Sequence, residues 1–160
     1  MTVRLALVLL TLPLAASRAH GPDAVAVAAE AATAMRALWN ASVAVHTELV
    51  GCLASSVDGD TLRITRIQPL LAGADSLAVS AESSLETCGP PTWQGTVHTH
   101  IALTADQRPY ALFSGADRGI MLMWWQRWKS DGTFCLLYAQ DQAHCEIDGS
   151  RVLIFPTARY

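Results

Sequence analysis

The sequence predicts an α/β domain in which a mixed β-sheet is flanked by helices. An Ala-rich segment with helical spacing comes first, several strand-like runs follow, and a capped helix leads into a C-terminal hairpin. With 160 residues, of which 51% are hydrophobic and 16% charged, the chain is long enough to bury a sizeable core. We therefore expect a single globular domain behind a short N-terminal leader.

Residues 1–19 have the pattern of a signal peptide. A positively charged start at Met1–Arg4 precedes an apolar run at Leu5–Ala16, and Ser17–Ala19 supplies small residues for cleavage. The run is shorter than the roughly 20 apolar residues that a transmembrane helix needs. An uncleaved helix is the alternative, but the run lacks the polar stripe of an amphipathic helix. We expect a secreted or periplasmic protein whose mature domain spans residues 20–160.

The charge balance of the chain excludes two classes of partner. Loss of Arg4 and Arg18 with the leader lowers the number of basic residues from 11 to 9 against 14 acidic ones, so the net charge falls from −3 to about −5. A mildly acidic chain without a basic cluster is not typical of proteins that bind nucleic acid or anionic membranes. We expect no nucleic-acid partner, and no membrane association after signal cleavage.

The four cysteines are best explained as two disulfides. Their number is even, they follow a signal peptide, and the chain has no Cys-x-x-Cys motif. Four cysteines allow three pairings. A hairpin would bring Cys135 opposite Cys145, which leaves Cys52 for Cys88, and we prefer this pairing over the other two.

The N-terminal half predicts one helix and two strands. Ala-rich sequence with apolar residues at helical spacing predicts a helix from Pro22 to Asn40. Thr47–Ser55 is an apolar run typical of a buried strand, with Glu48 at its start, and Leu62–Ile67 alternates as a half-exposed partner strand. Leu70–Thr87 is not assigned as a whole; within it, Ser76–Leu85 fits either a short strand or a helical piece.

The C-terminal half predicts a helix followed by strands. Ile120–Trp128 continues a helix that Ser114 begins, and a Gly-containing turn ends it. Thr133–Tyr138 and Ala143–Asp148 then form a hairpin, and Arg151–Phe155 is a last strand. These strands complete the predicted sheet.

Two histidines and one carboxylate predict a zinc site. His98 and His100 point to the same side of a strand, because side chains alternate along it. Asp117 lies at the third position of the helix that Ser114 caps, which brings a carboxylate to a helix start. Two imidazoles and one carboxylate are a usual set of ligands at a catalytic zinc ion.

Four blocks of sequence, taken in order, resemble the JAMM (MPN+/JAB) zinc metallopeptidase family. Glu48 matches the upstream glutamate, His98 and His100 match the His-x-His motif within Gly-Thr-Val-His-Thr-His, and Ser114 and Asp117 match Ser-x-x-Asp. The resemblance covers roughly residues 24–147. It implies a JAMM/MPN-like mixed β-sheet flanked by helices for residues 20–160, in an exported prokaryotic-type member of the family.

The resemblance also implies a mechanism and a role for each residue. His98, His100 and Asp117 would hold Zn²⁺, which activates a water molecule and polarises the scissile carbonyl. Glu48 would be the general base and acid, and Ser114 would stabilise the oxyanion of the tetrahedral intermediate. A second interpretation of Ser114 is that it only caps the helix.

The expected function is therefore that of an exported zinc-dependent peptidase or isopeptidase acting on a peptide or an isopeptide-linked protein. Two departures from the family leave the substrate open: the spacer between His100 and Ser114 is long, and Ile101 replaces a proline. A zinc hydrolase of a non-peptide amide is a weaker possibility, and a catalytically inactive MPN-like binding or scaffold module is the alternative of a different class. The oligomeric state is not predicted.

Two further histidines are assigned no metal. His46 is expected to be a surface residue, or a partner of Glu48 if the strand begins early enough, and His144 is expected to be an ordinary hairpin residue.

Overall fold

A computed structural model describes residues 22–70, 81–148, 152–154 and 158–159 of the chain. The predicted signal peptide, residues 1–19, lies outside the described residues, as do residues 71–80. No helix in the described ranges is long and apolar enough to cross a membrane.

The described part of the chain is a mixed α/β domain with eight strands and three helices. The strands are β1 (Ala24–Val27), β2 (Val50–Asp58), β3 (Thr61–Pro69), β4 (Gly95–Thr99), β5 (Gly132–Ala139), β6 (Gln142–Asp148), β7 (Val152–Ile154) and β8 (Ala158–Arg159). The helices are α1 (Ala29–Val45), α2 (Ala81–Thr87) and α3 (Gly115–Trp128). The predicted mixed α/β class is thereby confirmed.

All eight strands belong to one sheet. Its order is β1-β3-β2-β4-β5-β6-β7, and β8 pairs with the free part of β6. β1 pairs with β3 and β4 pairs with β5 in parallel, whereas the other neighbours are antiparallel. The sheet curves so far that β8 contacts β1, and the two ends of the sheet therefore approach each other.

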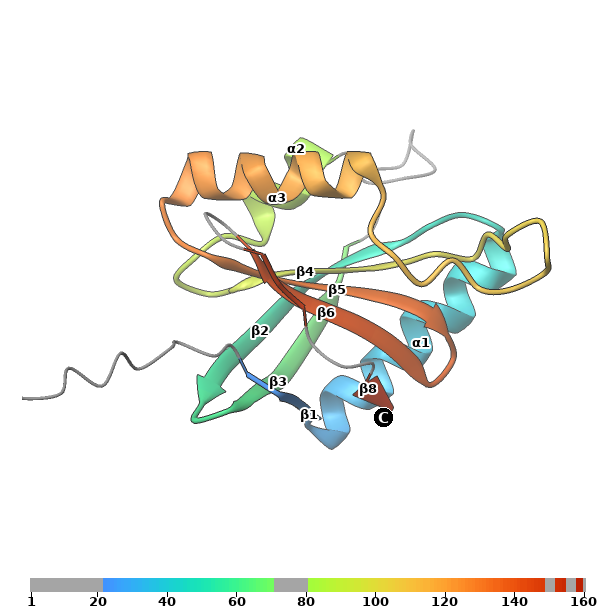
Figure 1. Cartoon of the computed structure of the whole chain (residues 1–160), viewed down its shortest axis with the longest axis horizontal. Helices are drawn as coiled ribbons and strands as arrows, with labels where there is room; N and C mark the ends of the chain where they lie inside the picture. Colours follow the sequence, from blue (N-terminus) through green and yellow to red (C-terminus); the bar gives the residue numbers. More distant parts are fainter. Residues whose placement is uncertain (1–21, 71–80, 149–151, 155–157, 160) are drawn as a thin grey trace, which may run out of the picture.

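Helices cover both faces of the sheet. Figure 1 shows α1 on one face and α2 with α3 on the other. The α1 face holds a core of twelve buried residues: Ala31, Met35, Leu38, Leu53, Leu62, Ile64, Ile67, Val97, Cys135, Leu137, Ala143 and Cys145. The α2/α3 face holds a second core of eight: Cys52, Leu85, Cys88, Phe113, Met121, Trp124, Phe134 and Leu136. The sheet thus separates two hydrophobic layers.

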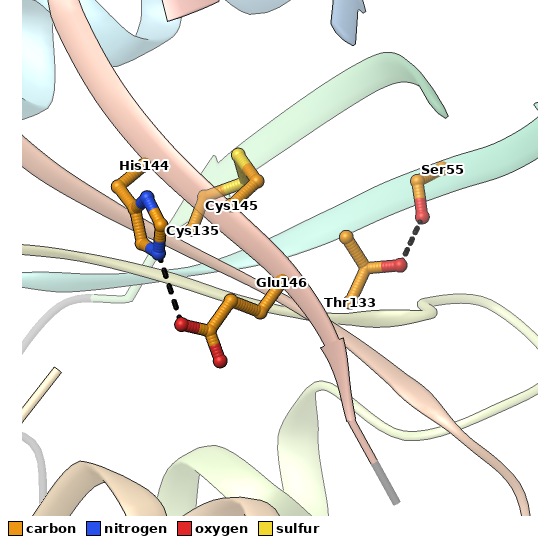
Figure 2. Close-up of a disulfide and its surroundings, with 6 residues drawn as sticks. All are labelled: Ser55, Thr133, Cys135, His144, Cys145 and Glu146. Atoms are coloured by element: carbon orange, nitrogen blue, oxygen red, sulfur yellow. Dashed lines mark hydrogen bonds and ion pairs between the residues drawn. A yellow bond between two sulfur atoms is a disulfide. The ribbon is translucent and has the colours of Figure 1, made fainter. Parts of the chain in front are cut away.

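Each of these layers contains one disulfide. Cys135–Cys145 joins opposite positions of β5 and β6 in the α1 layer, and Cys52–Cys88 joins β2 to the residue after α2 in the other layer. Figure 2 shows the first of them on the side of the β5–β6 ribbon opposite to the carboxylate of Glu146. The preferred pairing is confirmed, and no described cysteine is free.

The first predicted helix was placed too early. Residues 24–27 form β1, which pairs in parallel with β3, and α1 begins only at Ala29 after Ala28 as its N-cap. The helix also continues past Asn40 to Val45 and ends where His46 adopts a left-handed conformation, φ 52°. Backbone hydrogen bonds with a distant strand therefore prevail over the helical preference of the Ala-rich sequence at its N-terminal end.

The strand predicted at Thr47–Ser55 starts three residues later than expected, so Glu48 precedes β2 instead of belonging to it. Residues 81–87 of the undecided segment are helical and form α2. The alternating strand after the turn, the hairpin and the capped helix are confirmed as β3, β5–β6 and α3.

Candidate metal centre

The two histidines lie where β4 ends. His98 is the fourth residue of β4, and His100 follows its last residue, so both side chains leave the sheet on the α2/α3 side. Gly95 allows β4 to lie close to β5, because a Cβ atom at this position would overlap the carbonyl oxygen of Thr133. The backbone N–H of His100 donates to the carbonyl of Leu137 at 2.8 Å, which fixes the strand end.

Asp117 is brought to the histidines by the start of α3. Ser114 is the N-cap, its Oγ accepts the N–H of Asp117 at 3.2 Å, and the Asp117 carboxylate accepts the N–H of Ser114 at 2.6 Å. This capping box fixes the carboxylate in the first turn of the helix. The predicted capping pair is confirmed.

The three side chains converge on one point. His98 Nε2 lies 3.2 Å from His100 Nε2 and 3.2 Å from Asp117 Oδ1, and His100 Nε2 lies 3.5 Å from Asp117 Oδ2. Ligands held about 2.0–2.1 Å from a tetrahedral ion stand about 3.3 Å apart, so these separations suit one ion. The structure therefore contains a triad that could hold a metal, made of the three predicted residues.

A backbone carbonyl orients the more buried imidazole. Nδ1 of His100 lies 3.1 Å from the carbonyl oxygen of Tyr110, to which it can only donate. With its proton on Nδ1, a neutral His100 presents the lone pair of Nε2 to the triad. Such a partner for the second ring nitrogen is common among metal-ligating histidines. The sequence carried no sign of this contact, because a carbonyl is present at every residue.

Burial and hydrogen bonding oppose each other in the triad. Burial alone lowers the pKa of His100, but the hydrogen bonds with Asp117 and Tyr110 and the nearby carboxylate charges raise it above 6.5 overall. Burial alone raises the pKa of Asp117, but hydrogen bonds from His100 and His98 outweigh burial and hold that pKa well below its usual range. A cation that binds here therefore competes with a proton, chiefly on His100.

Glu48 lies at the edge of the triad. Its Oε1 is 4.0 Å from His100 Nε2, and its side chain is 53% exposed, compared with 6% for His100. It is close enough to share a water molecule with an ion in the triad, but it makes no direct contact of ligand length. The structure thus brings all five predicted site residues together.

A buried network fixes the segment that carries Glu48. The hydroxyl of Thr99, between the two histidines, points to the α1 side and shares a 2.6 Å hydrogen bond with Ser42 Oγ. It also accepts the N–H of Leu49 at 2.9 Å, while Ser42 donates to the carbonyl of Thr47 at 2.5 Å. Both residues beside Glu48 are therefore tied to β4 and α1. The sequence analysis missed this network.

A second polar cluster lies beside the triad on the same face. Glu146 is only 1% exposed and accepts from Arg118. Its carboxylate also lies 2.9 Å from His144 Nε2, and Figure 2 shows this contact. The ring of Phe113 stands between this cluster and the metal triad, 5.7 Å from the rings of both His98 and His144. His144 is therefore a buried polar partner and not an ordinary hairpin residue. The alternation His144-x-Glu146 places both side chains on one face, and this signal was available in the sequence.

His46 has no part in the site. It is exposed, it is the C-cap of α1, and it lies four residues before Val50, the first residue of β2, so it does not share a strand face with Glu48. The expectation of a surface histidine is confirmed.

Comparison with known proteins identifies a fold and nothing further. No family model and no curated protein matches the sequence. The chain is similar to the solution structure of protein DSY2949 from Desulfitobacterium hafniense, with a TM-score of 0.50 and 16% identity over 82% of this chain and 91% of that one. The likeness extends over most of both chains and concerns their architecture.

Proposed function

We propose that this protein is an exported zinc-dependent peptidase or isopeptidase of the JAMM type, which hydrolyses an amide bond. The observation that carries the proposal is the convergence of His98, His100 and Asp117, with Glu48 Oε1 only 4.0 Å from His100 Nε2. Two imidazoles and one carboxylate leave a fourth position for water or substrate, which is the arrangement of catalytic rather than structural zinc sites.

The donor set fits zinc better than the other common divalent ions. Mg²⁺ and Ca²⁺ prefer oxygen ligands, whereas two of these three donors are imidazole nitrogens. A bound zinc ion would supply a Lewis acid and a water molecule whose pKa is lowered to about 7. Two backbone groups orient these donors: the carbonyl of Tyr110 fixes the imidazole of His100, and the N–H of Ser114 fixes the carboxylate of Asp117.

Glu48 and Ser114 would move the proton and stabilise the developing charge. The Glu48 carboxylate would take a proton from the attacking water and deliver it to the leaving amine. Ser114 Oγ accepts the Asp117 N–H and keeps its own hydroxyl proton, which it would donate to the substrate oxygen as negative charge develops there. In this proposal, capping and catalysis use different parts of one hydroxyl group.

Export is supported by the covalent structure. Two disulfides, one in each layer of the domain, are typical of proteins that work outside the cytosol. A secreted or periplasmic peptidase acts on the peptides or conjugated proteins of that compartment.

The proposal is tested by elemental analysis of the purified protein. We expect about one zinc per chain, and its loss in His100→Ala. His46→Asn is the matched control: it removes a histidine outside the triad at a left-handed position that asparagine tolerates, and it should keep the zinc. Circular dichroism verifies that each variant is folded. Folded wild-type protein that binds no zinc would contradict the proposal and favour a binding module instead.

A further inference from the structure

An apolar cleft adjoins the candidate metal centre. It has a volume of about 310 Å³, lies between the α2/α3 layer and the strands β2, β4 and β5, and is lined in part by His98, Asp117 and Glu48. This volume is at the lower end of the range for small-molecule sites, roughly 300–1,000 Å³. The cleft can therefore admit one side chain but not a folded domain.

The wall of the cleft is mainly hydrocarbon. Its apolar lining includes Leu49, Val50, Phe113, Ile120, Met121 and Phe134. Phe113, Met121 and Phe134 are at most 7% exposed and belong to the core of the α2/α3 layer, so this wall is part of the packed interior. Among the described residues that line the cleft, Glu48 and Asp117 are the charged ones, and both lie within 4.0 Å of His100 Nε2.

The charges and the shape of the cleft select its occupant. An anionic side chain would be repelled by the carboxylates of Glu48 and Asp117, and a cationic one, although these carboxylates attract it, would lose its hydration against aromatic and aliphatic walls. A glycine would leave the apolar surface uncovered. An uncharged aliphatic or aromatic side chain buries this surface and needs no polar partner.

We propose that the cleft is a specificity pocket for an apolar side chain next to the scissile amide bond. This inference rests on the proposed function and deepens it, because it names the substrate class: amides flanked by a residue such as leucine or phenylalanine. The side chain belongs either to the acyl half or to the amine half of the substrate. Burial of an apolar side chain accounts for binding from either half, and the test below distinguishes the two halves.

The test measures how tightly the zinc-loaded protein binds two pairs of hydroxamates, which share one metal-binding group. Hydroxamates of N-acetyl-leucine and N-acetylglycine carry the side chain on the acyl side, and malonyl hydroxamates of leucine amide and glycine amide carry it on the amine side. In one pair we expect the leucine compound to bind about 10- to 100-fold tighter by calorimetry, as burial of a leucine side chain implies. Equal Kd values within both pairs would overturn the inference.

Two variants of α3 locate the effect. Ile120→Asp places a carboxylate on the wall of the cleft and should abolish the preference for leucine. Leu122→Asp makes a matched change on the same helix at a side chain that is 54% exposed, and it should keep the preference. A preference that survives Ile120→Asp in folded protein would place the side chain elsewhere and contradict the proposal.

A measurement on the metal-free protein separates this inference from the proposed function. N-acetyl-leucine amide should shift the NMR signals of the Ile120 and Met121 methyl groups, and N-acetylglycine amide should not. If zinc fails to bind, the proposed function fails while this measurement still decides what the cleft accepts. If zinc binds but the leucine compound leaves these methyl signals unchanged, the pocket is refuted and the metal centre stands.

Discussion

The two faces of the sheet differ in what they bury. On the α1 face the core consists of aliphatic side chains and one disulfide, and its buried hydroxyls of Ser42 and Thr99 satisfy each other. On the α2/α3 face the sheet buries His100, His144 and Glu146, and these groups are paired with other polar groups. Both faces belong to the same strands, so the difference lies in alternate residues of each strand.

This contrast separates what holds the domain together from what it does. Burial of apolar surface on the α1 face stabilises the fold, and no charged group belongs to its core. The α2/α3 face keeps ionisable groups out of water, which is unfavourable unless they are paired, and such groups are candidates for a functional site. Substitutions of apolar side chains on the α1 face should therefore change stability alone, and those on the α2/α3 face should change chemistry as well.

Glu48→Gln gives the largest expected effect. Loss of the proposed general base should lower turnover of an amide substrate by roughly 10²- to 10⁴-fold while zinc stays bound, because the three proposed ligands remain. Glu30→Gln, on the exposed first turn of α1, is the control and should leave turnover unchanged. Turnover is measured with an amide substrate and zinc by elemental analysis; loss of zinc from Glu48→Gln would instead make Glu48 a ligand.

Two leucine substitutions compare the faces directly. Leu53 and Leu136 are both fully buried, one in each core, and truncation to alanine should cost about 2–5 kcal/mol of unfolding free energy in either case. Only Leu136→Ala should also weaken zinc binding, by about 10-fold or more, because Leu136 lies opposite His98 in the sheet. Denaturant unfolding and zinc titration measure the two quantities. Equal zinc affinities in the two variants would remove the distinction between the faces.

The two disulfides, one on each face, should stabilise the fold by different amounts, because each restricts the unfolded chain to a different extent. Cys52–Cys88 spans 36 residues and Cys135–Cys145 spans 10. Loop-closure entropy predicts losses of about 4 and about 3 kcal/mol when each is replaced by a pair of alanines. Urea unfolding of the two double variants measures the difference. The reverse order would mean that contacts in the folded state, and not the size of the loop, decide what each disulfide contributes.

Ser114→Ala gives the smallest expected change in stability. Loss of the cap should cost about 1 kcal/mol of unfolding free energy. Ser114→Ala should also lower turnover, because the proposed donor to the substrate oxygen is lost. Ser114→Asp keeps a side-chain acceptor for the N–H of Asp117 but lacks the hydroxyl donor, so its unfolding free energy should return toward the wild-type value while its turnover stays low. If turnover returns together with stability, Ser114 acts only as a cap.

The sequence predicted the site better than the edge of the sheet. His-x-His and Ser-x-x-Asp are local patterns, and a strand and a capping box convert each of them directly into geometry. Ala24–Val27 carries no such signal: it is continuous with Ala-rich sequence, and only its parallel pairing with Thr61–Ile64 makes it a strand. Contacts between segments distant in the chain leave no local trace.

The sequence analysis missed parts of the site for the same reason. The carbonyl of Tyr110 reaches His100 because the long loop folds back, and Ser42 meets Thr99 across 57 positions of sequence. The pairing of Arg118 with Glu146 also joins two distant elements. None of these contacts follows from spacing, whereas the shared face of His144 and Glu146 did.

Thr99, the residue between the two histidines, limits how this site could be transplanted into another protein. In His98-Thr99-His100, strand alternation sends the middle hydroxyl to the opposite face, where it contacts Ser42 and the N–H of Leu49. A graft of the three triad side chains alone would therefore leave the segment that bears Glu48 without the hydrogen bonds that hold it in place. A transplanted site would need the end of β4 with the side chains on both of its faces, together with Ser42 of α1.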